Sequence, residues 1–307
     1  MNENRSIAKH IIFGLGKSGL SCARYFDRIN KPYTLIDSRE DLKLECLKSL
    51  ICCQSTFFGE LDIQLVEECL QLVVSPGINL NHPLVKRARQ LQVDVCGDVE
   101  LFARECHKPI VAITGSNGKS TVTDLIAKVM SLNGINCQKG GNIGLPVLDF
   151  LPLQQADIYV LELSSFQLDS TESLQPDVAI LLNISEDHMD RYLDFDDYIH
   201  SKKKIFNNAK CRLFNWQDKN TYPFELSALD MPFSSQKLTS KKIKNQAYLQ
   251  STEKTFDLWV NDNKMINSKQ LNITGIHNMM NVLACLATLH CLNIELSNQG
   301  MDGLKSY

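Results

Sequence analysis

The sequence has no C-x-x-C pair among its 11 cysteines, which argues against a zinc site, and the odd count argues against a disulfide framework. It also lacks any run near the ~18 apolar residues that a membrane-spanning helix needs. The N-terminus, Met1 to Lys9, is polar and resembles no signal peptide. We therefore expect a soluble cytoplasmic protein with reduced cysteines and no membrane partner.

The chain also has no excess of positive charge, no internal repeat and no low-complexity tract. Its net charge of -3 argues against a nucleic-acid partner, because such surfaces cluster Lys and Arg. With 44% hydrophobic and 22% charged residues, the composition is that of a globular protein. At 307 residues the chain exceeds the usual ~100 to 200 residues of one domain, so we expect two.

Short apolar runs alternate with amphipathic segments along the first hundred residues, which indicates a parallel α/β sheet of Rossmann type. A second series begins at Pro109 and predicts an α/β domain with a mostly parallel sheet, of the type found in phosphate-loop ATPases. The predicted domains are residues 1–107 and 108–298, and residues 299–307 are expected to begin a linker. Within the second domain, residues 248–250 and 256–260 resemble short antiparallel strands, and residues 278–292 have helical periodicity.

A glycine-rich loop follows the predicted strand at residues 110–113 and opens an amphipathic helix. Its residues are Thr114, Gly115, Ser116, Asn117, Gly118, Lys119, Ser120 and Thr121. Glycines let backbone N–H groups approach phosphates at a helix N-terminus, where Lys119 would hold the β/γ region and Ser120 a Mg²⁺ ion. The spacing is a variant of G-x-x-x-x-G-K-[ST], because Ile113 stands at the more distant glycine position. The alternative is a plain helix start with a solvated lysine.

Polar residues follow the next two predicted strands. Glu162 ends one of them, and a cluster from Asn183 to Asp190 that includes His188 follows the other. Ligands bind at the carboxyl ends of strands in open α/β sheets, and oxygen ligands there suit Mg²⁺. The residues alone leave open whether Glu162 only caps a helix and whether His188 is structural.

Two further segments carry candidate residues. Residues 198–206 form a basic helical stretch in which the residues alone do not choose among Lys202, Lys203 and Lys204. Asn278 and Asn281 lie one turn apart on one predicted helix. One interpretation is that both side-chain amides face a nucleotide. The other is that Asn278 only caps the N-terminus of the helix.

The first domain has its own glycine loop, Gly14 to Gly19, which fits G-x-G-x-x-G, and Asp37 ends the next strand. Alone, this pattern indicates NAD. A dehydrogenase has no need of a second phosphate loop, however, and any diphosphate can use the first. Ser38 and Arg39 are placed to hold another phosphate or a nucleobase, and Gly77 follows a further strand at the same edge.

Taken together and in order, these motifs resemble those of the Mur ligases, and the resemblance covers nearly the whole chain. Its most specific parts are residues 75–78, 115–121, 140–144, 162–168 and 186–192. Within the family, the likeness is to the branch that joins D-glutamate to UDP-N-acetylmuramoyl-L-alanine in peptidoglycan biosynthesis.

The resemblance implies an ADP-forming ligase that uses ATP and Mg²⁺. ATP activates the substrate carboxylate as an acyl phosphate, and the amine of D-glutamate then attacks it. The implied catalytic residues are Lys119, Glu162, His188 and Lys202, and the implied metal ligands are Ser120, Glu162, His188 and Lys202. Lys202 matches the family lysine that becomes a carbamate, and Lys203 is the second choice.

The same matching assigns ligand contacts by position. UDP-substrate contacts fall on Lys17, Ser18, Ser38, Arg39, Gly77, Asn142, Ser164 and His188. ATP contacts fall on residues 115–121, Asn278 and Asn281. The resemblance implies a monomer, and the chain stops about where the family's third, amino-acid-binding domain begins. These 307 residues are therefore expected to bind substrate but to ligate D-glutamate weakly or not at all by themselves.

Three alternatives remain. One is another Mur or folylpolyglutamate-type ligase, which would share the ATP domain and differ in the first. The second is an NAD-linked oxidoreductase, which would bind nicotinamide and have no use for Lys119. The third is a non-catalytic UDP-sugar binding module, whose ligand binding would not depend on Lys119.

Overall fold

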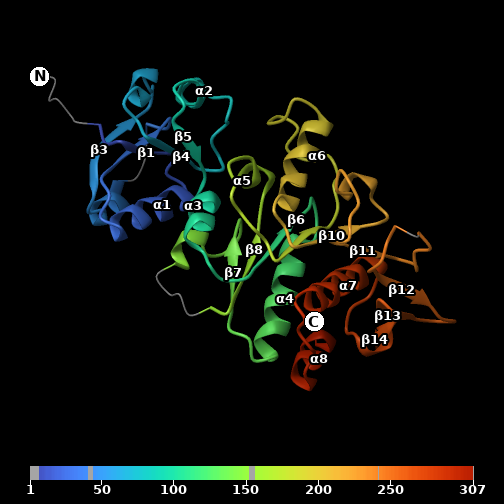
Figure 1. Ribbon diagram of the computed structural model, residues 1–307. Helices are drawn as coiled ribbons and strands as arrows, with labels where there is room; N and C mark the ends of the chain where they lie inside the picture. Colours follow the sequence, from blue (N-terminus) through green and yellow to red (C-terminus); the bar gives the residue numbers. More distant parts are fainter. Residues whose placement is uncertain (1–6, 41–43, 152–155, 241, 307) are drawn as a thin grey trace, which may run out of the picture. The chain divides into compact units, whose positions relative to one another are not determined.

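The computed structural model describes residues 7–40, 44–151, 156–240 and 242–306. The chain forms two compact units (Figure 1). The first comprises Met1–Cys106, Leu145–Leu153 and Asp169–Ser173, and the second comprises His107–Gly144, Gln154–Leu168 and Leu174–Tyr307. The main division thus falls between Cys106 and His107.

The first unit is built on a parallel five-stranded sheet in the order β3-β2-β1-β4-β5. Its strands are β1 (His10–Phe13), β2 (Tyr33–Asp37), β3 (Cys53–Phe58), β4 (Gln71–Val74) and β5 (Asp94–Cys96). Its helices are α1 (Lys17–Arg28), α2 (Pro83–Gln90) and α3 (Asp98–Glu105), with short 3-10 helices η1 (Leu44–Ser49), η2 (Ile63–Val66) and η3 (Val147–Asp149). The three central strands are apolar and almost wholly buried, as expected for a parallel sheet covered on both faces.

Two segments return to the first unit from later in the chain. In the first, Arg24 forms a bidentate ion pair with Asp149, and Arg28 donates to the Leu148 carbonyl. In the second, the backbone N–H groups of Glu172 and Ser173 donate to the buried Glu100 carboxylate. A boundary drawn at a single residue does not anticipate these segments, because their contacts are set by tertiary packing.

The second unit is built on a nine-stranded sheet in the order β14-β13-β12-β11-β10-β9-β6-β8-β7. Its strands are β6 (Ile110–Thr114), β7 (Cys137–Gly141), β8 (Ile158–Glu162), β9 (Val178–Leu181), β10 (Cys211–Asn215), β11 (Asp230–Ser234), β12 (Ala247–Ser251), β13 (Phe256–Val260) and β14 (Asn263–Asn267). The sheet is parallel from β7 to β12, and β13 and β14 continue it in antiparallel pairing. The mostly parallel sheet and the antiparallel strands at residues 248–250 and 256–260 are therefore confirmed.

The helices of the second unit are α4 (Lys119–Leu132), α5 (Ser165–Asp169, whose last residue belongs to the first unit), α6 (Phe195–Lys203), α7 (Ile276–Cys291) and α8 (Asn298–Lys305). Three 3-10 helices complete it, η4 (Lys204–Phe206), η5 (Lys219–Thr221) and η6 (Ser268–Gln270). Helix α4 packs on β6, β7 and β8, and α7 packs on β10 to β13. Val122, Leu125 and Ile126 of α4 join Leu283 and Leu286 of α7 in one buried cluster with the inner side of the sheet.

Residues 299–306 correct one expectation, because they do not begin a linker. They lie in α8, which Ser297 caps by accepting the N–H of Gly300, and which packs against α4. Leu304 is almost completely buried in the core of the second unit. The segment folds because Leu304 packs against the apolar core. The residues around Leu304 are mostly polar, so the sequence alone does not indicate this packing. Residue 307 lies outside the described residues.

Among the residues that the structure describes, no helix is long and apolar enough to cross a membrane.

The close packing of α1 on β1 generates a stability prediction. A Cβ atom on Gly19 would lie 1.9 Å from the Gly14 carbonyl oxygen, whereas one on Gly77 would meet nothing within 4 Å. Gly19→Ala is therefore expected to destabilise the protein by about 1–3 kcal/mol, as overpacking does. Gly77→Ala, the matched control, should leave stability unchanged or slightly raised. Denaturant unfolding measures both, and equal midpoints for the two variants would contradict the expected clash.

Candidate functional site

Three neighbouring strands of the second unit end side by side and carry the candidate site. β6 lies between β8 and β9, and the register sets Ile113 opposite both Glu162 and Ile180. The glycine-rich loop of residues 114–121, called the phosphate loop below, follows β6. Glu162 ends β8, and Asn183 comes just after β9. The parallel register therefore gathers polar groups that are far apart in sequence.

The phosphate loop turns into α4 at Gly118, the N-cap of the helix. Gly118 has φ +83°, a left-handed conformation that favours glycine. A Cβ atom there would also lie 3.3 Å from Oδ1 of Asn281, in the second turn of α7. The structure thus brings Asn281 to the phosphate loop, although residues 118 and 281 are distant in sequence.

The side chain of Asn183 fixes the backbone of the phosphate loop by hydrogen bonds. Its Oδ1 accepts the N–H of Asn117 at 2.8 Å, and its Nδ2 donates to the Asn117 carbonyl at 2.9 Å. The Asn183 carbonyl also accepts the N–H of Ser116, and the Ser116 hydroxyl donates to the Ser185 carbonyl. One amide side chain therefore satisfies both main-chain groups of Asn117 in a loop that has no regular secondary structure.

Two lysine amines meet at one carbonyl of this loop. Lys119 Nζ donates to the Gly115 oxygen at 2.9 Å and to the Ser116 oxygen at 3.2 Å. Lys202 Nζ donates to the same Gly115 oxygen at 3.1 Å and lies 4.8 Å from the centre of the Tyr198 ring. Lys202 is only 2% exposed. Burial, aided by the positive charge of Lys119, lowers the pKa of Lys202 to about 7, so a large share of the amine is neutral at physiological pH.

Glu162 is the centre of the acidic part of the site. It is 1% exposed, and its Oε2 accepts the hydroxyl of Ser120 at 2.8 Å. Asn142, directly after β7, anchors it, because Asn142 Nδ2 donates to Oε1 at 3.0 Å and the Asn142 N–H donates to the Glu162 carbonyl. Gly141 permits this approach, since a Cβ atom there would lie 2.4 Å from that carbonyl oxygen. A carboxylate and a hydroxyl in contact are hard oxygen donors of the kind that Mg²⁺ prefers.

The remaining predicted residues of the second unit lie in other surroundings. His188 is exposed, lies 3.5 Å from Asp187 and contacts the Phe166 ring. Ser164 is engaged with Gln167 in reciprocal hydrogen bonds at the start of α5. Asn278 donates to the Thr274 carbonyl, and the N-cap of α7 is Gly275. Over the described ranges no three His, Cys, Asp or Glu side chains gather as a metal site, so Glu162 would need other oxygen donors around a cation.

In the first unit the glycine loop is tied to Asp37. The buried Asp37 carboxylate accepts the N–H of Leu15 at 2.7 Å and a bidentate pair of bonds from the Arg39 guanidinium. Burial alone would raise the pKa of Asp37, but the bonds from Arg39 and Leu15 outweigh burial and hold it below its usual value. In a dinucleotide site this acid accepts the ribose hydroxyls. Here both of its oxygens are already occupied.

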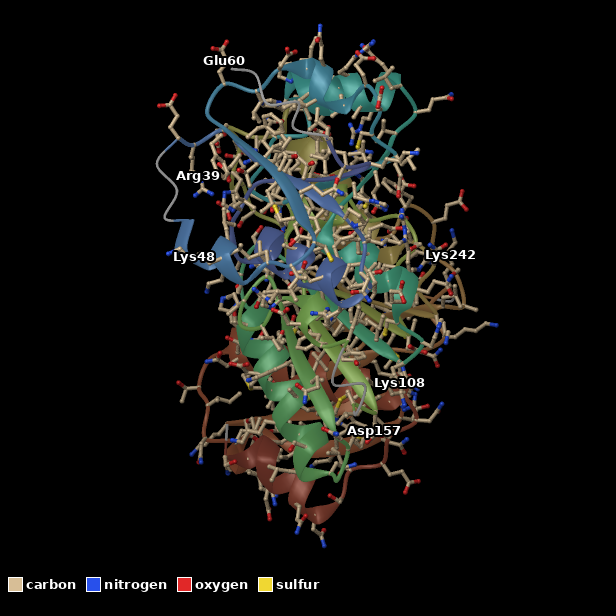
Figure 2. All side chains as sticks on the ribbon, turned by 90° about the vertical axis from the view of Figure 1, so that its left-hand side faces the viewer. Arg39, Lys48, Glu60, Lys108, Asp157 and Lys242 are labelled. Atoms are coloured by element: carbon tan, nitrogen blue, oxygen red, sulfur yellow. The ribbon has the colours of Figure 1, made fainter. Side chains whose placement is uncertain are left out.

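The other predicted residues of the first unit lie in this loop or after neighbouring strands. Lys17 and Ser18 open α1, and Gly77 lies in the exposed turn after β4. Ser38 follows β2, and the side chain of Arg39 extends from the surface there (Figure 2). They lie where β1, β2 and β4 end, at the carboxyl edge of the sheet.

Sequence reasoning missed two residues that shape the phosphate loop. The sequence presents Asn183 as one member of a polar cluster and Tyr198 as the residue four positions before Lys202, and it assigns neither of them a contact with the loop. The Tyr198 hydroxyl lies 3.4 Å from the Ser116 hydroxyl, and its ring lies beneath Lys202. An asparagine directly after a buried strand was a usable signal, whereas the contact of Tyr198 across the site had none.

Comparison with known proteins matches both units to family models. Residues 8–97 match the "Mur ligase MurD-like, N-terminal domain" model, and residues 113–289 match the "Mur ligase middle domain" model. Similar proteins include the UDP-N-acetylmuramoylalanine--D-glutamate ligases of Saccharophagus degradans, 38% identical over 94% of this chain, and Vibrio atlanticus, 40% identical over all of it. The chain spans 64% and 68% of the length of these relatives.

Solved structures of lower identity share the fold. The chain resembles an MPL ligase from Neisseria meningitides with a TM-score of 0.62 at 15% identity, over 98% of both chains. It also resembles the MurC ligase of Thermotoga maritima with a TM-score of 0.53 at 20% identity, over 97% of this chain and 68% of the other. At these identities the likeness supports the architecture alone.

The two hydrogen bonds between the Asn183 side chain and the Asn117 backbone predict that replacing Asn183 selectively weakens nucleotide binding. Asn183→Ala should lower stability by about 1 kcal/mol and weaken ATP or ADP binding roughly tenfold, because the loop loses its fixed shape. Asn215→Ala is the matched control, since Asn215 lies at the end of β10 in the same sheet and its side chain also accepts a backbone N–H, that of Gln217. Asn215→Ala should lower stability by a similar amount and leave the affinity for nucleotide unchanged. Equal affinities of the two variants in calorimetric titration would contradict the role of the two Asn183 hydrogen bonds.

Proposed function

The chain belongs to the Mur ligase family, and on this premise we propose that it carries out the ATP- and UDP-substrate-binding parts of D-glutamate addition to UDP-N-acetylmuramoyl-L-alanine. The names of the relatives that are 35–40% identical support this choice within the family. The chain spans about two thirds of their length, so the complete ligation is part of the proposal.

The observation that carries the proposal is the contact of Ser120 with Glu162 beside the Lys119 amine. The first residues of α4 present a helix N-terminus and a lysine to phosphates, and the Ser120 hydroxyl and Glu162 carboxylate lie next to them. This combination suits a nucleoside triphosphate bound with Mg²⁺. An NAD enzyme has no use for it, and Asp37 in the first unit is already bonded to Leu15 and Arg39.

The proposed chemistry proceeds in two steps. The carboxylate of UDP-N-acetylmuramoyl-L-alanine attacks the γ-phosphorus of ATP, forming an acyl phosphate and releasing ADP. The amine of D-glutamate then attacks the acyl carbon, and the tetrahedral intermediate collapses to an amide as phosphate leaves. Lys119 and the N-terminus of α4 stabilise the negative charge on the transferred phosphoryl group.

Four residues are proposed as ligands of Mg²⁺, namely Ser120, Glu162, His188 and Lys202. When bound there, Mg²⁺ neutralises phosphate charge and polarises the transferred group. Ser120 and Glu162 already touch, and Asn142 holds the carboxylate in place. His188 is the weakest of the four, because its present contacts are with Asp187 and Phe166.

Lys202 fits the ligand set as a carbamate. A neutral amine attacks carbon dioxide, and a buried lysine with a pKa of about 7 supplies that neutral form. The N–C bond forms as one C=O π bond of carbon dioxide opens, and the nitrogen releases a proton to solvent, so the neutral amine becomes an oxygen anion near Lys119. The change would remove the repulsion between the two amines at the Gly115 carbonyl.

The substrate assignments follow the two units. Residues 1–107 are proposed to bind the UDP part through Lys17, Ser18, Ser38, Arg39 and Gly77, and residues 108–298 to bind ATP. Asn142, Ser164 and His188 would face the muramoyl part, and Asn278 and Asn281 the adenine side. The contact of Asn281 with Gly118 supports its assignment.

D-Glutamate would be held mainly by the part of the relatives that these residues do not match. The 307 residues alone should therefore ligate D-glutamate weakly, as a cytoplasmic monomer.

Ligand titration tests the proposal first. The chain should bind UDP-N-acetylmuramoyl-L-alanine and be indifferent to NAD in calorimetry. Lys119→Ala should weaken ATP binding by roughly tenfold to a hundredfold, as loss of a charge-assisted hydrogen bond does, and spare the UDP substrate. Binding of NAD without the UDP substrate would instead identify an oxidoreductase. Unchanged ATP binding by Lys119→Ala would remove the phosphate-loop assignment.

A second test concerns the carbamate. In ¹³C-bicarbonate, the protein should show a carbamate carbonyl signal in its NMR spectrum. Lys202→Arg should abolish this signal, because arginine has no free amine to react. Lys203→Arg is the control one residue away and should retain it. Loss of the signal in the Lys203 variant alone would transfer the role to that residue, and its absence from the unaltered protein would refute the modification.

A further inference from the structure

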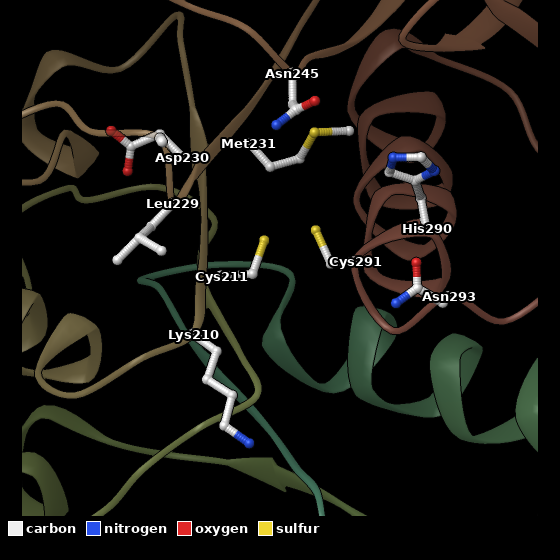
Figure 3. Close-up of a pocket in the computed structure, with 10 residues that line it drawn as sticks. Lys210, Cys211, Leu229, Asp230, Met231, Asn245, His290, Cys291 and Asn293 are labelled. Atoms are coloured by element: carbon white, nitrogen blue, oxygen red, sulfur yellow. The ribbon is translucent and has the colours of Figure 1, made fainter.

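Two cysteine thiols meet in the second unit, far from the phosphate loop. Cys211 is the first residue of β10 and Cys291 the last residue of α7, 80 positions apart in sequence. Both side chains pack against the main core cluster and line the same pocket. Figure 3 shows the two sulfur atoms side by side, one from the strand and one from the helix. β10 and α7 pack together, so the contact is part of the folded core.

The pair is accessible to a small reagent. The two cysteines line a pocket of about 230 Å³ whose other walls include Lys210, Asp230, His290 and Asn293. A water molecule occupies roughly 30 Å³ of liquid, so a molecule the size of hydrogen peroxide fits easily. Both thiols are partly buried, unlike Cys22 and Cys285, which are enclosed by the core.

We propose that Cys211 and Cys291 form an oxidisable dithiol, which a peroxide converts into an intrachain disulfide that joins β10 to α7. In the first step one thiolate attacks a peroxide oxygen. An S–O bond forms, the O–O bond breaks, and the leaving hydroxide takes up a proton as water. In the second step the other sulfur attacks this sulfenic acid, and water leaves as the S–S bond forms. Overall, two thiols and one hydrogen peroxide give one disulfide and two waters.

The surroundings make this dithiol slow to oxidise. The neighbouring Cys211 thiol, together with burial, raises the pKa of the Cys291 thiol, which disfavours the reactive thiolate. The nearby cation is turned away, because the Lys210 ammonium pairs with Asp177 at 2.7 Å. The His290 ring lies 3.1 Å from the Asn261 amide. Neither Lys210 nor His290 is therefore placed to stabilise a thiolate, as the cations of fast peroxide sensors are.

The cross-link would join residues 80 positions apart and enclose β11 to β14 and nearly all of α7. Closing so long a loop restricts the unfolded chain and stabilises the folded state. Asn278 and Asn281 lie at the opposite end of α7, so the cross-link leaves the phosphate loop unaltered.

The test treats the purified chain with excess hydrogen peroxide at mildly alkaline pH. Intact mass should fall by about 2 Da, proteolytic mapping should recover a peptide pair joined through Cys211 and Cys291, and Tm should rise by roughly 5 °C or more. Dithiothreitol should reverse all three changes. ATP binding should be the same before and after oxidation, which separates this proposal from the ligase assignment.

Cys211→Ser and Cys291→Ser should each abolish the linked peptide and the rise in Tm. Cys137→Ser is the matched control, since Cys137 is also partly buried against the same core cluster. It should retain both effects. The proposal would be overturned by sulfinic acid on either cysteine without a cross-link, by linkage of a different pair, or by a linked protein whose Tm does not rise. Mapping of the unaltered chain decides the matter even where a variant folds poorly.

Discussion

The parallel pairing of β6 with both β8 and β9 is the constraint on which the candidate site depends. It sets the phosphate loop, Glu162 and Asn183 at one edge of the sheet. Because all three follow buried strands, they inherit the rigidity of a core that is apolar on both faces. A shift of one residue in this register would turn the Glu162 side chain to the other face and away from Ser120.

The site places two lysine amines close together near the phosphate loop. Two lysine amines share the Gly115 carbonyl, and one of them is buried. Buried like charges are costly unless an anion neutralises them, so the arrangement favours phosphate near Lys119 and a neutral or modified Lys202. Glu162 accepts its side-chain hydrogen bonds from Ser120 and Asn142, whereas both lysine amines donate to main-chain carbonyls of the loop.

In the first unit the glycine loop lies beside an acid whose hydrogen bonds are already made within the protein. Its glycine loop and the acid after β2 have the spacing of a dinucleotide site, yet Asp37 spends its hydrogen bonds on Leu15 and Arg39. The bidentate pair with Asp37 thereby fixes the arginine at the carboxyl edge of the sheet. The segments at residues 145–153 and 169–173 complete this unit from a distance in sequence, through Asp149 and the N–H groups that Glu100 binds.

The sequence by itself determined the two α/β sheets, the loop that opens α4 and the polar strand ends, because apolar periodicity and glycine spacing are local. It also determined the family, since residues 115–121 and 186–192 are specific motifs. Only the tertiary structure decided which groups meet. It paired Asn183 with Asn117, brought Asn281 to Gly118, buried Lys202 beside Lys119, and turned the expected linker into α8. These are contacts between segments distant in sequence, and their energies depend on packing and dielectric that no local pattern encodes.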